Sequence, residues 1–577
     1  MVRCSLQTHG GLLPVKRLSA AQRFRFLLPL VALVIASALS AEDVTPERLN
    51  QADKEPDNWL TYGGTYRAWR YSPLDQINAS NVQKLSVAWA FQFGDVQGGL
   101  QCTPLVADGV MYVVGPNNRV FALDAATGKK LWSYFYKHQE GTQFRYGHFS
   151  RGLALGHGNV YLGSLDNYVV ALDAKTGEEN WKVNVEDSKK YGCSITGAPL
   201  VVKDIVIVGS TGGDSAHRGH LVAYEGKTGK MRWRFNTVPG PGEKGNESWL
   251  GDSWKFGGGA TWMTGSYDPE LDLLYWGVGN PAADFYGEAR KGTNLYTDCA
   301  IALKPDTGEL AWYFQEIPHD VWDYDSAYEC ILVDLPVNGK VRKLLIHPNK
   351  GGYIWVLDRT NGEFVSGWKF MDNLNWSTGL DAKGIPVGRR EPVPDVPIFI
   401  CPSISGARSW NQASYNPKTG LLYNIGIEWC TELTARKQEM KEGEFAMAGT
   451  FPTKPLPSGR VITHLDAHDP ITGKKEWSHE SRYALLASIL STGGSLVFTG
   501  DPEGIFFALD ARSGTKLWSF NTGAGHRGSP ITYAVNGKQY IATPSGGGGA
   551  VYDGLTEVWP EAKDFVAGAT LFVFTLP

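Results

Sequence analysis

The stretch VFALDAATGKKLW at residues 120–132 recurs along the chain in one fixed register. Close copies are VVALDAKTGEENW (169–181), LVAYEGKTGKMRW (221–233), AIALKPDTGELAW (300–312), LDAHDPITGKKEW (465–477) and FFALDARSGTKLW (506–518). In all six, a tryptophan lies four residues after a turn glycine. Weaker copies around Trp89 and Trp368 bring the number of these tryptophans to eight. Chance does not preserve such spacing, so the chain is a repeat protein.

Each copy has the pattern of two β-strands joined by a tight turn. An apolar alternating run leads into a D-x-x-[TS]-G turn, whose glycine can adopt positive φ, and the next run carries the ring. A further strand pair precedes several copies, as in GVMYVVGPNNR at 109–119. Because a single four-stranded unit cannot bury both faces, we predict an all-β fold, an eight-bladed β-propeller with tryptophan-docking repeats over residues 42–577. The tryptophans are interpreted as packing residues.

The first residues have the pattern of an export signal. Four basic side chains within residues 16–25 precede an apolar run at 26–38 that ends in Ala-Ser-Ala. We assign residues 1–41 to a signal peptide, with an uncleaved anchor as the alternative. The run is shorter than the roughly 18 residues of a spanning helix, so we expect a periplasmic or secreted protein with no integral membrane span after processing.

Charge and cysteine content restrict the classes of partner. The formal net charge is −4 and basic residues do not cluster, which excludes nucleic acid as a predicted partner. Six cysteines follow the leader, and an even number in an exported chain favours disulfides. No CxxCH motif is present, so no c-type haem is expected and any electrons must leave to a separate carrier.

Three long insertions, at about 236–299, 313–350 and 370–464, interrupt the repeat, and insertions of this size are often functional. The first contains GGGATW, ending at Trp262, and GVGNP with Asn280, while the second contains HDVWDYD with Asp320, Asp323 and Asp325. Before them, GSTGGDSAHRG places Asp214 in a glycine-rich turn. Carboxylate and amide oxygens are ligands for a hard cation such as Ca²⁺ or a lanthanide, although solvated turn acids give the same pattern.

These motifs, together with HPNKGGYIWVLDRTNGE around Lys350, resemble the quinoprotein alcohol dehydrogenases that depend on pyrroloquinoline quinone (PQQ), which include methanol and ethanol dehydrogenases. The similarity runs from WLTYGG at Trp59 to GATLFVF near the C-terminus. It implies oxidation of a small alcohol to an aldehyde or ketone, with hydride transfer to metal-bound PQQ and electrons passed to a soluble cytochrome c or similar acceptor. A homodimer is compatible with it. A non-catalytic propeller scaffold of the cell envelope and a quinoprotein acting on sugars or polyols are the alternatives.

The resemblance also implies roles for individual residues. Asp323 would be the catalytic base and Trp262 the floor on which PQQ stacks. The cofactor would contact Trp262, Lys350, Thr196, Arg151, Thr211, Gly212 and Gly213, and one metal ion would be bound by Asp214, Asn280, Asp323 and Asp325. An aspartate at position 325 is similar to the lanthanide members, so a lanthanide is expected, with Ca²⁺ as the alternative.

The chain departs from the family pattern around the expected cofactor. Arg145 and Tyr146 stand where many relatives have vicinal cysteines, and Asp214 stands where they have glutamate. Gln101, Leu486 and Ser409 replace a common glutamate, tryptophan and asparagine. Cys401 and Cys430 resemble a disulfide pair of the family, and residues 432–451 are expected to form part of a pocket lid.

Overall fold

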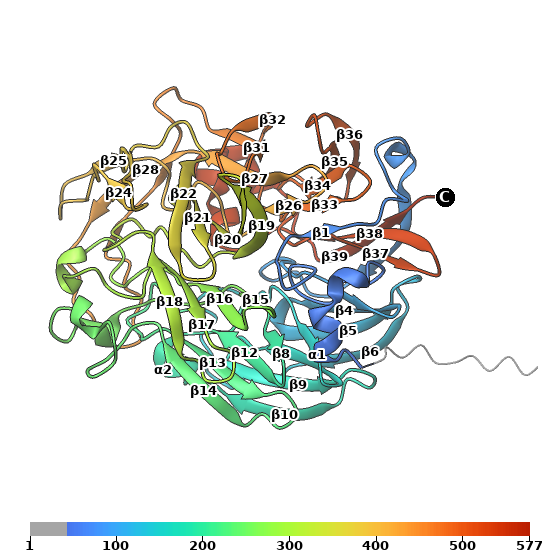
Figure 1. Ribbon diagram of the computed structural model, residues 1–577, viewed down its shortest axis with the longest axis horizontal. Helices are drawn as coiled ribbons and strands as arrows, with labels where there is room; N and C mark the ends of the chain where they lie inside the picture. Colours follow the sequence, from blue (N-terminus) through green and yellow to red (C-terminus); the bar gives the residue numbers. More distant parts are fainter. Residues whose placement is uncertain (1–42) are drawn as a thin grey trace, which may run out of the picture. The chain divides into compact units, whose positions relative to one another are not determined.

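A computed structural model describes residues 43–577, and β-strands dominate it (Figure 1). The predicted signal peptide lies outside the described residues. The α-helices are single turns: α1 (Pro46–Asn50), α2 (Ser188–Tyr191) and α3 (Ala550–Asp553). The 3₁₀ turns are Ala52–Lys54, Val82–Lys84, Pro116–Asn118, Asn246–Ser248, Ser253–Phe256, Gly287–Arg290, Gly554–Glu557 and Pro560–Asp564. Within the described part of the chain, no helix is long and apolar enough to cross a membrane.

Eight sheets share one antiparallel four-stranded plan, and in six of them every pair of hydrogen-bonded neighbours among the four strands is also a pair of neighbours in sequence. The first four are β3 (Leu105–Ala107), β4 (Val110–Gly115), β5 (Arg119–Asp124), β6 (Lys130–Phe135); β7 (Ala154–Gly156), β8 (Asn159–Gly163), β9 (Tyr168–Asp173), β10 (Glu179–Asn184); β11 (Leu200–Val202), β12 (Ile205–Gly209), β13 (His220–Glu225), β14 (Met231–Asn236); and β15 (Ser266–Asp268), β16 (Leu273–Gly277), β17 (Cys299–Leu303), β18 (Leu310–Gln315). The prediction of an all-β repeat protein is confirmed.

The other four sheets continue this plan. They are β19 (Ile331–Val337), β20 (Lys340–Pro348), β21 (Tyr353–Asp358), β22 (Glu363–Lys369); β26 (Ser414–Asn416), β27 (Leu421–Glu428), β31 (Ile462–His468), β32 (Lys475–Ser481); β33 (Leu490–Thr492), β34 (Leu496–Gly500), β35 (Ile505–Asp510), β36 (Lys516–Asn521); and β37 (Ile531–Val535), β38 (Lys538–Ser545), β39 (Thr570–Thr575), β2 (Ser86–Gln92). The last sheet joins the two ends of the described chain, because N-terminal β2 pairs with C-terminal β39. β1 (Tyr71–Ser72) adds to β33 in parallel.

Burial shows which edge of each sheet faces inward. The first strands, such as β3, β7 and β11, are buried at every position, whereas the last strands, such as β6 and β10, alternate between exposed and covered residues. First strands of successive sheets contact one another, for example β7 with β11 and β15 with β19. The sheets therefore turn their first strands toward a shared interior and their last strands toward solvent.

The repeated tryptophans connect each sheet to the next. A Cβ placed on the turn glycine Gly177 would lie 2.5 Å from the Trp132 ring, so only glycine permits this contact. The same indole donates to the carbonyl of Ala174 at 3.1 Å. Equivalent N–H to carbonyl bonds reach the next turn from Trp89, Trp181, Trp233, Trp312, Trp368 and Trp477. Ring packing and hydrogen bonding together explain the fixed register in the sequence.

The third insertion contributes β26 and β27 to one of these sheets, and its other strands lie outside the eight sheets. It contains the hairpin β23 (Gly379–Leu380) and β24 (Pro386–Val387), and a sheet of β25 (Ile398–Ile400), β28 (Cys430–Ala435), β29 (Gly449–Thr450) and β30 (Thr453–Lys454). The expected Cys401–Cys430 disulfide is present. Expectation and structure differ for the other cysteines of the described chain, Cys102, Cys193, Cys299 and Cys330, which are free and buried and pack as small apolar side chains.

Candidate active site

One cavity of about 780 Å³ is lined by all of the residues that the sequence assigned to the site: Arg151, Thr196, Thr211, Gly212, Gly213, Asp214, Trp262, Asn280, Asp323, Asp325 and Lys350. They lie on loops next to the inner strands. Thr196 precedes β11, Asp214 follows β12 and Lys350 follows β20. Since the inner strands of several sheets approach the same interior, side chains far apart in sequence meet in one place.

An acidic cluster forms one wall of this cavity. Carboxylate oxygens of Asp214, Asp284 and Asp323 lie within 4.8 Å of one another. The Asn280 amide nitrogen donates to Asp214 at 3.3 Å and to Asp284 at 3.0 Å. Sequence reasoning missed Asp284, which lies behind the cavity lining. Its position four residues after Asn280, in NPAAD, is the signal that was available.

This cluster carries more negative charge than its protein neighbours compensate. Burial, assisted by Asp325, raises the pKa of Asp214 to about 6. Burial also raises the pKa of Asp284 and of Asp323 well above the usual range. Asp284 Oδ2 and Asp323 Oδ1 are buried without a hydrogen-bond donor. Buried acids with unpartnered oxygens are the arrangement that a bound hard cation satisfies, so the residues present fit a metal ion.

Lys350 and Asp325 connect the acids to the floor of the cavity. The Lys350 ammonium donates to Asp323 Oδ2 at 2.9 Å and to Asp325 Oδ2 at 3.3 Å. Burial alone would lower the pKa of Lys350, but these two carboxylates raise it well above its usual value. The other oxygen of Asp325 accepts from the Trp262 indole at 3.3 Å and from the Asn280 backbone N–H at 3.3 Å. Asp325 therefore fixes the Trp262 ring relative to the acids.

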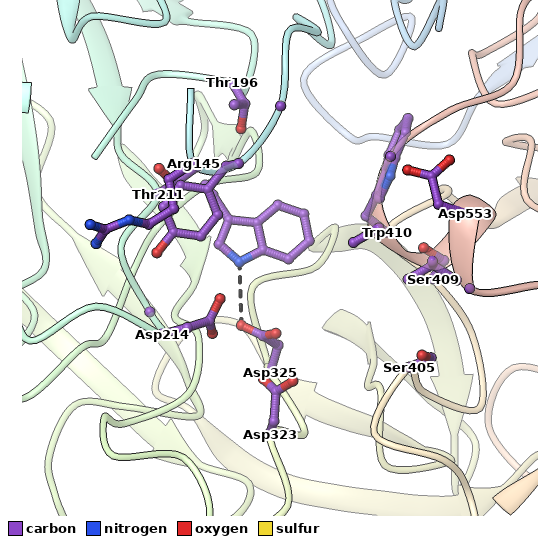
Figure 2. Close-up of a pocket in the computed structure, with 18 of the residues that line it drawn as sticks. Arg145, Thr196, Thr211, Asp214, Asp323, Asp325, Ser405, Ser409, Trp410 and Asp553 are labelled. Atoms are coloured by element: carbon purple, nitrogen blue, oxygen red, sulfur yellow. Dashed lines mark hydrogen bonds between the residues drawn. The ribbon is translucent and has the colours of Figure 1, made fainter. Parts of the chain in front are cut away.

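Aromatic rings and arginines form the rest of the slot. The Arg151 guanidinium lies 4.8 Å from the Trp262 ring centre and 4.8 Å from that of Trp410, and it donates to Thr196 Oγ1 at 2.5 Å. Figure 2 shows Asp214, Asp323 and Asp325 together on one side, with Trp410, Ser409 and Asp553 across from them. Arg527, which donates to Ser409 at 3.1 Å, also lines the cavity. No motif in the sequence identified Trp410, Arg527 or Asp553 as residues of the site. A planar, anionic cofactor fits a slot lined by flat rings and cationic groups.

Two glycines make the close approach of the loops possible. A Cβ on Gly213 would lie 2.4 Å from Asn280 Oδ1, and one on Gly279 would lie 2.4 Å from Asp325 Oδ1. Any side chain at either position would displace a group assigned to the metal.

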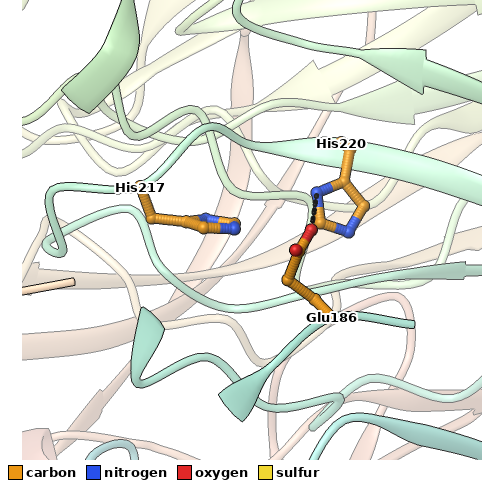
Figure 3. Close-up of side chains that lie close together, drawn as sticks. All are labelled: Glu186, His217 and His220. Carbon is orange, nitrogen blue, oxygen red and sulfur yellow. Dashed lines mark ion pairs between the residues drawn. The ribbon is translucent and has the colours of Figure 1, made fainter. Parts of the chain in front are cut away.

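A second group of potential ligands lies beside this site. Figure 3 shows Glu186, His217 and His220 together, and ligand atoms of all three lie within 4.8 Å of one another. However, Arg234 Nη2 lies 2.6 Å from Glu186 Oε2 and 2.9 Å from His220 Nδ1, where a cation would bind. The guanidinium supplies the positive charge here, so we interpret this group as a structural cluster.

Comparisons with known proteins identify the family of the chain. Residues 59–369 and 460–541 match the family described as PQQ: glucose/ethanol/alcohol dehydrogenase, beta-propeller domain. The chain is 39% identical to quinoprotein alcohol dehydrogenase PedH of Pseudomonas putida, over 96% of this chain and 97% of that protein. It is 35% identical to a quinoprotein ethanol dehydrogenase of Pseudomonas aeruginosa, over 95% of each chain.

Among solved structures, one described as a europium-containing methanol dehydrogenase superposes with a TM-score of 0.87 at 33% identity, covering 92% of this chain and 100% of that one. The quinohemoprotein alcohol dehydrogenase ADHIIG of Pseudomonas putida gives a TM-score of 0.87 at 35% identity, covering 93% and 83%.

Proposed function

The chain belongs to the family of PQQ-dependent quinoprotein alcohol dehydrogenases. We propose that its eight sheets are the blades of one propeller and that the enzyme oxidises an alcohol to an aldehyde or ketone in the central cavity. The observation that carries the proposal is the convergence of eleven sequence-assigned residues on one cavity. A non-catalytic scaffold would not require this convergence of acids, a lysine and an indole.

The residues present divide into two binding sets. The PQQ ring would rest on Trp262, with Arg151, Thr196, Thr211, Gly212, Gly213 and Lys350 around its polar edge. The cation would be held by Asp214, Asn280, Asp323 and Asp325, with Asp284 behind them. When bound, PQQ accepts two electrons as hydride and the cation makes its carbonyl more electrophilic.

Asp323 is the proposed base. Its Oδ2 is held by Lys350 at 2.9 Å, whereas its Oδ1 has no donor and is free to accept the hydroxyl proton of an alcohol. Burial favours the protonated acid, and the adjacent ammonium opposes that tendency. Lys350 therefore orients Asp323 and opposes its protonation.

We further propose that the cation is a lanthanide, because the additional carboxylate Asp325 suits a trivalent ion and its larger coordination shell. Similarity to the europium-containing enzyme supports this choice, and Ca²⁺ is the alternative. The leader sequence supports a periplasmic location, and the absence of a haem attachment motif supports electron transfer to a separate cytochrome c. Sugars or polyols as substrates remain the competing proposal.

Reconstitution tests the proposed function directly. Purified protein is loaded with PQQ and either La³⁺ or Ca²⁺, and dye reduction is followed across a panel of alcohols and sugars. We expect alcohol-dependent reduction with La³⁺, a loss of about 10²–10⁴-fold in Asp323→Asn, and loss of the La³⁺-dependent rate in Asp325→Ala. Equal activity with Ca²⁺ before and after the Asp325 substitution would reject the lanthanide assignment. Failure to bind PQQ with either ion would reject the function.

A further inference from the structure

Arg145 joins three separate parts of the cavity rim. Its Nη1 donates to Ser215 Oγ at 3.0 Å and to the carbonyl of Gly443 at 2.7 Å. Tyr146 reinforces the first contact, because its hydroxyl lies 2.8 Å from the same Ser215 oxygen. Ser215 is completely buried and directly follows Asp214. Both side chains thus hold the residue next to an acid that is assigned to the cation.

Residues 442–447, here called the rim segment, are bonded to the same loop through their backbone. Gly443 N donates to Ala216 O at 2.8 Å, and Ala216 N donates to Glu444 O at 2.9 Å. Ala446 N donates to the carbonyl of Asp214 at 2.8 Å. The rim segment contributes Phe445 and Met447 to the cavity wall. Cavity wall and acid-bearing loop are therefore one hydrogen-bonded unit.

Arg145 is a cationic side chain that connects the two segments of this unit. A Cβ on Gly192 would lie 2.6 Å from the Arg145 Cζ, and one on Gly443 would lie 1.9 Å from the carbonyl of Lys190. Gly192 thus leaves room for the guanidinium, and Gly443 permits the close approach of the rim segment to the Lys190 carbonyl. Hydrogen bonds from a charged donor contribute more than neutral ones.

We propose that Arg145 is a positioning residue that clamps the rim segment to the loop 211–216 and thereby holds the Asp214 carboxylate where it receives the cation. This inference rests on the proposed function, since it assigns a cation to the acidic cluster. The Asp214 carbonyl accepts from Ala446 N and Ser215 directly follows Asp214, so the clamp constrains the backbone that carries this carboxylate.

The test compares Arg145→Met with a matched control, Lys190→Met. Lys190 also contacts the rim segment, through an ion pair with Glu442 at 3.1 Å, but both side chains are half exposed and such pairs contribute little. Two measurements are made on the full chain without PQQ: amide hydrogen exchange of the rim segment, and titration with Tb³⁺ followed by tryptophan-sensitised luminescence.

We expect Arg145→Met to accelerate rim exchange and to weaken Tb³⁺ binding, each by about tenfold, while Lys190→Met changes neither by more than about twofold. Ser215→Ala, which removes the shared hydroxyl, should act in the same direction and serves if Arg145→Met does not fold. If Arg145→Met and Ser215→Ala both leave the exchange of the rim segment unchanged, Arg145 does not clamp it. If exchange becomes faster but the affinity for Tb³⁺ does not change, the clamp does not position Asp214. Wild-type protein that binds no Tb³⁺ would contradict the proposed function, while the exchange measurement, which needs no cation, still decides whether Arg145 holds the rim.

Discussion

Replacing Lys350 with methionine should destabilise the protein without its cation and leave it rescuable by that cation. Lys350 is 11% exposed and pairs with Asp323 and Asp325, whose side chains are 7% and 9% exposed. Methionine keeps most of the side-chain length but removes the charge. Removing one partner of a buried ion pair leaves an uncompensated charge and costs about 3–5 kcal/mol.

A bound trivalent ion should recover much of this loss. At 100 times its dissociation constant, a ligand that binds only the folded state adds about 2.7 kcal/mol. The free energy of unfolding is measured in guanidinium chloride for wild type and Lys350→Met, with and without La³⁺. We expect La³⁺ to stabilise the variant at least as much as the wild type, because the ion replaces the missing ammonium.

Lys350→Met/Asp325→Asn provides the control for this experiment. The second change removes one of the two unpaired charges, so the double variant should be more stable in the cation-free state than Lys350→Met alone. A Lys350→Met protein as stable as the wild type without any cation would refute the reasoning, because the acids would then need no compensating charge.

Three other outcomes follow from the structure. Trp132→Phe should cost about 1 kcal/mol through loss of the indole N–H bond to the next sheet, whereas Trp132→Ala should cost about 3–5 kcal/mol, both measured by chemical denaturation. Burial disfavours charged His464, but ion pairs with Asp466 and Glu428 outweigh it and raise the pKa of His464 to about 9. The resulting stabilisation of the folded state is about 3 kcal/mol, is complete below about pH 6.5 and is lost as the pH rises through about 9. The free energy of unfolding of the wild type should therefore fall between these pH values, and this fall should be smaller in His464→Gln. Asp284→Asn should weaken Tb³⁺ binding about tenfold, measured by luminescence titration, although the residue does not line the cavity.

The fold was accessible from sequence because its physical basis is local and repeated. A glycine that must accept positive φ and a ring four residues later recur at constant spacing. In the structure, the ring of one repeat packs on the turn glycine of the next repeat, in the neighbouring sheet. Cys102, Cys193, Cys299 and Cys330 show the limit of counting, since an even number of cysteines does not place their sulfur atoms within bonding distance. The number of cysteines indicates an oxidising compartment, but the distance between two sulfur atoms decides whether they form a disulfide.

The site was accessible only where a residue belongs to a recognisable motif. Asp214, Trp262 and Asp323 stand in short conspicuous segments, but Trp410 and Asp284 stand in ordinary ones and become visible only when the sheets are assembled. The sequence also identified Arg145 as a departure without indicating its contacts. Its partner Gly443 is 298 positions away, a separation at which no local pattern carries information.

The arrangement of the acids follows from how the sheets are joined. Asp214, Asn280 and Asp323 come from loops on successive sheets, so the distances among their oxygens depend on the rotation between one sheet and the next. Seven of the junctions have one indole each, which packs on a glycine and donates to a carbonyl of the following turn. Trp233 and Trp312 set the two junctions among the sheets that carry these three residues, and neither ring lines the cavity. A small rotation at either junction changes the distances among the ligand oxygens. The packing tryptophans therefore determine how closely the oxygens that would bind the proposed cation approach one another.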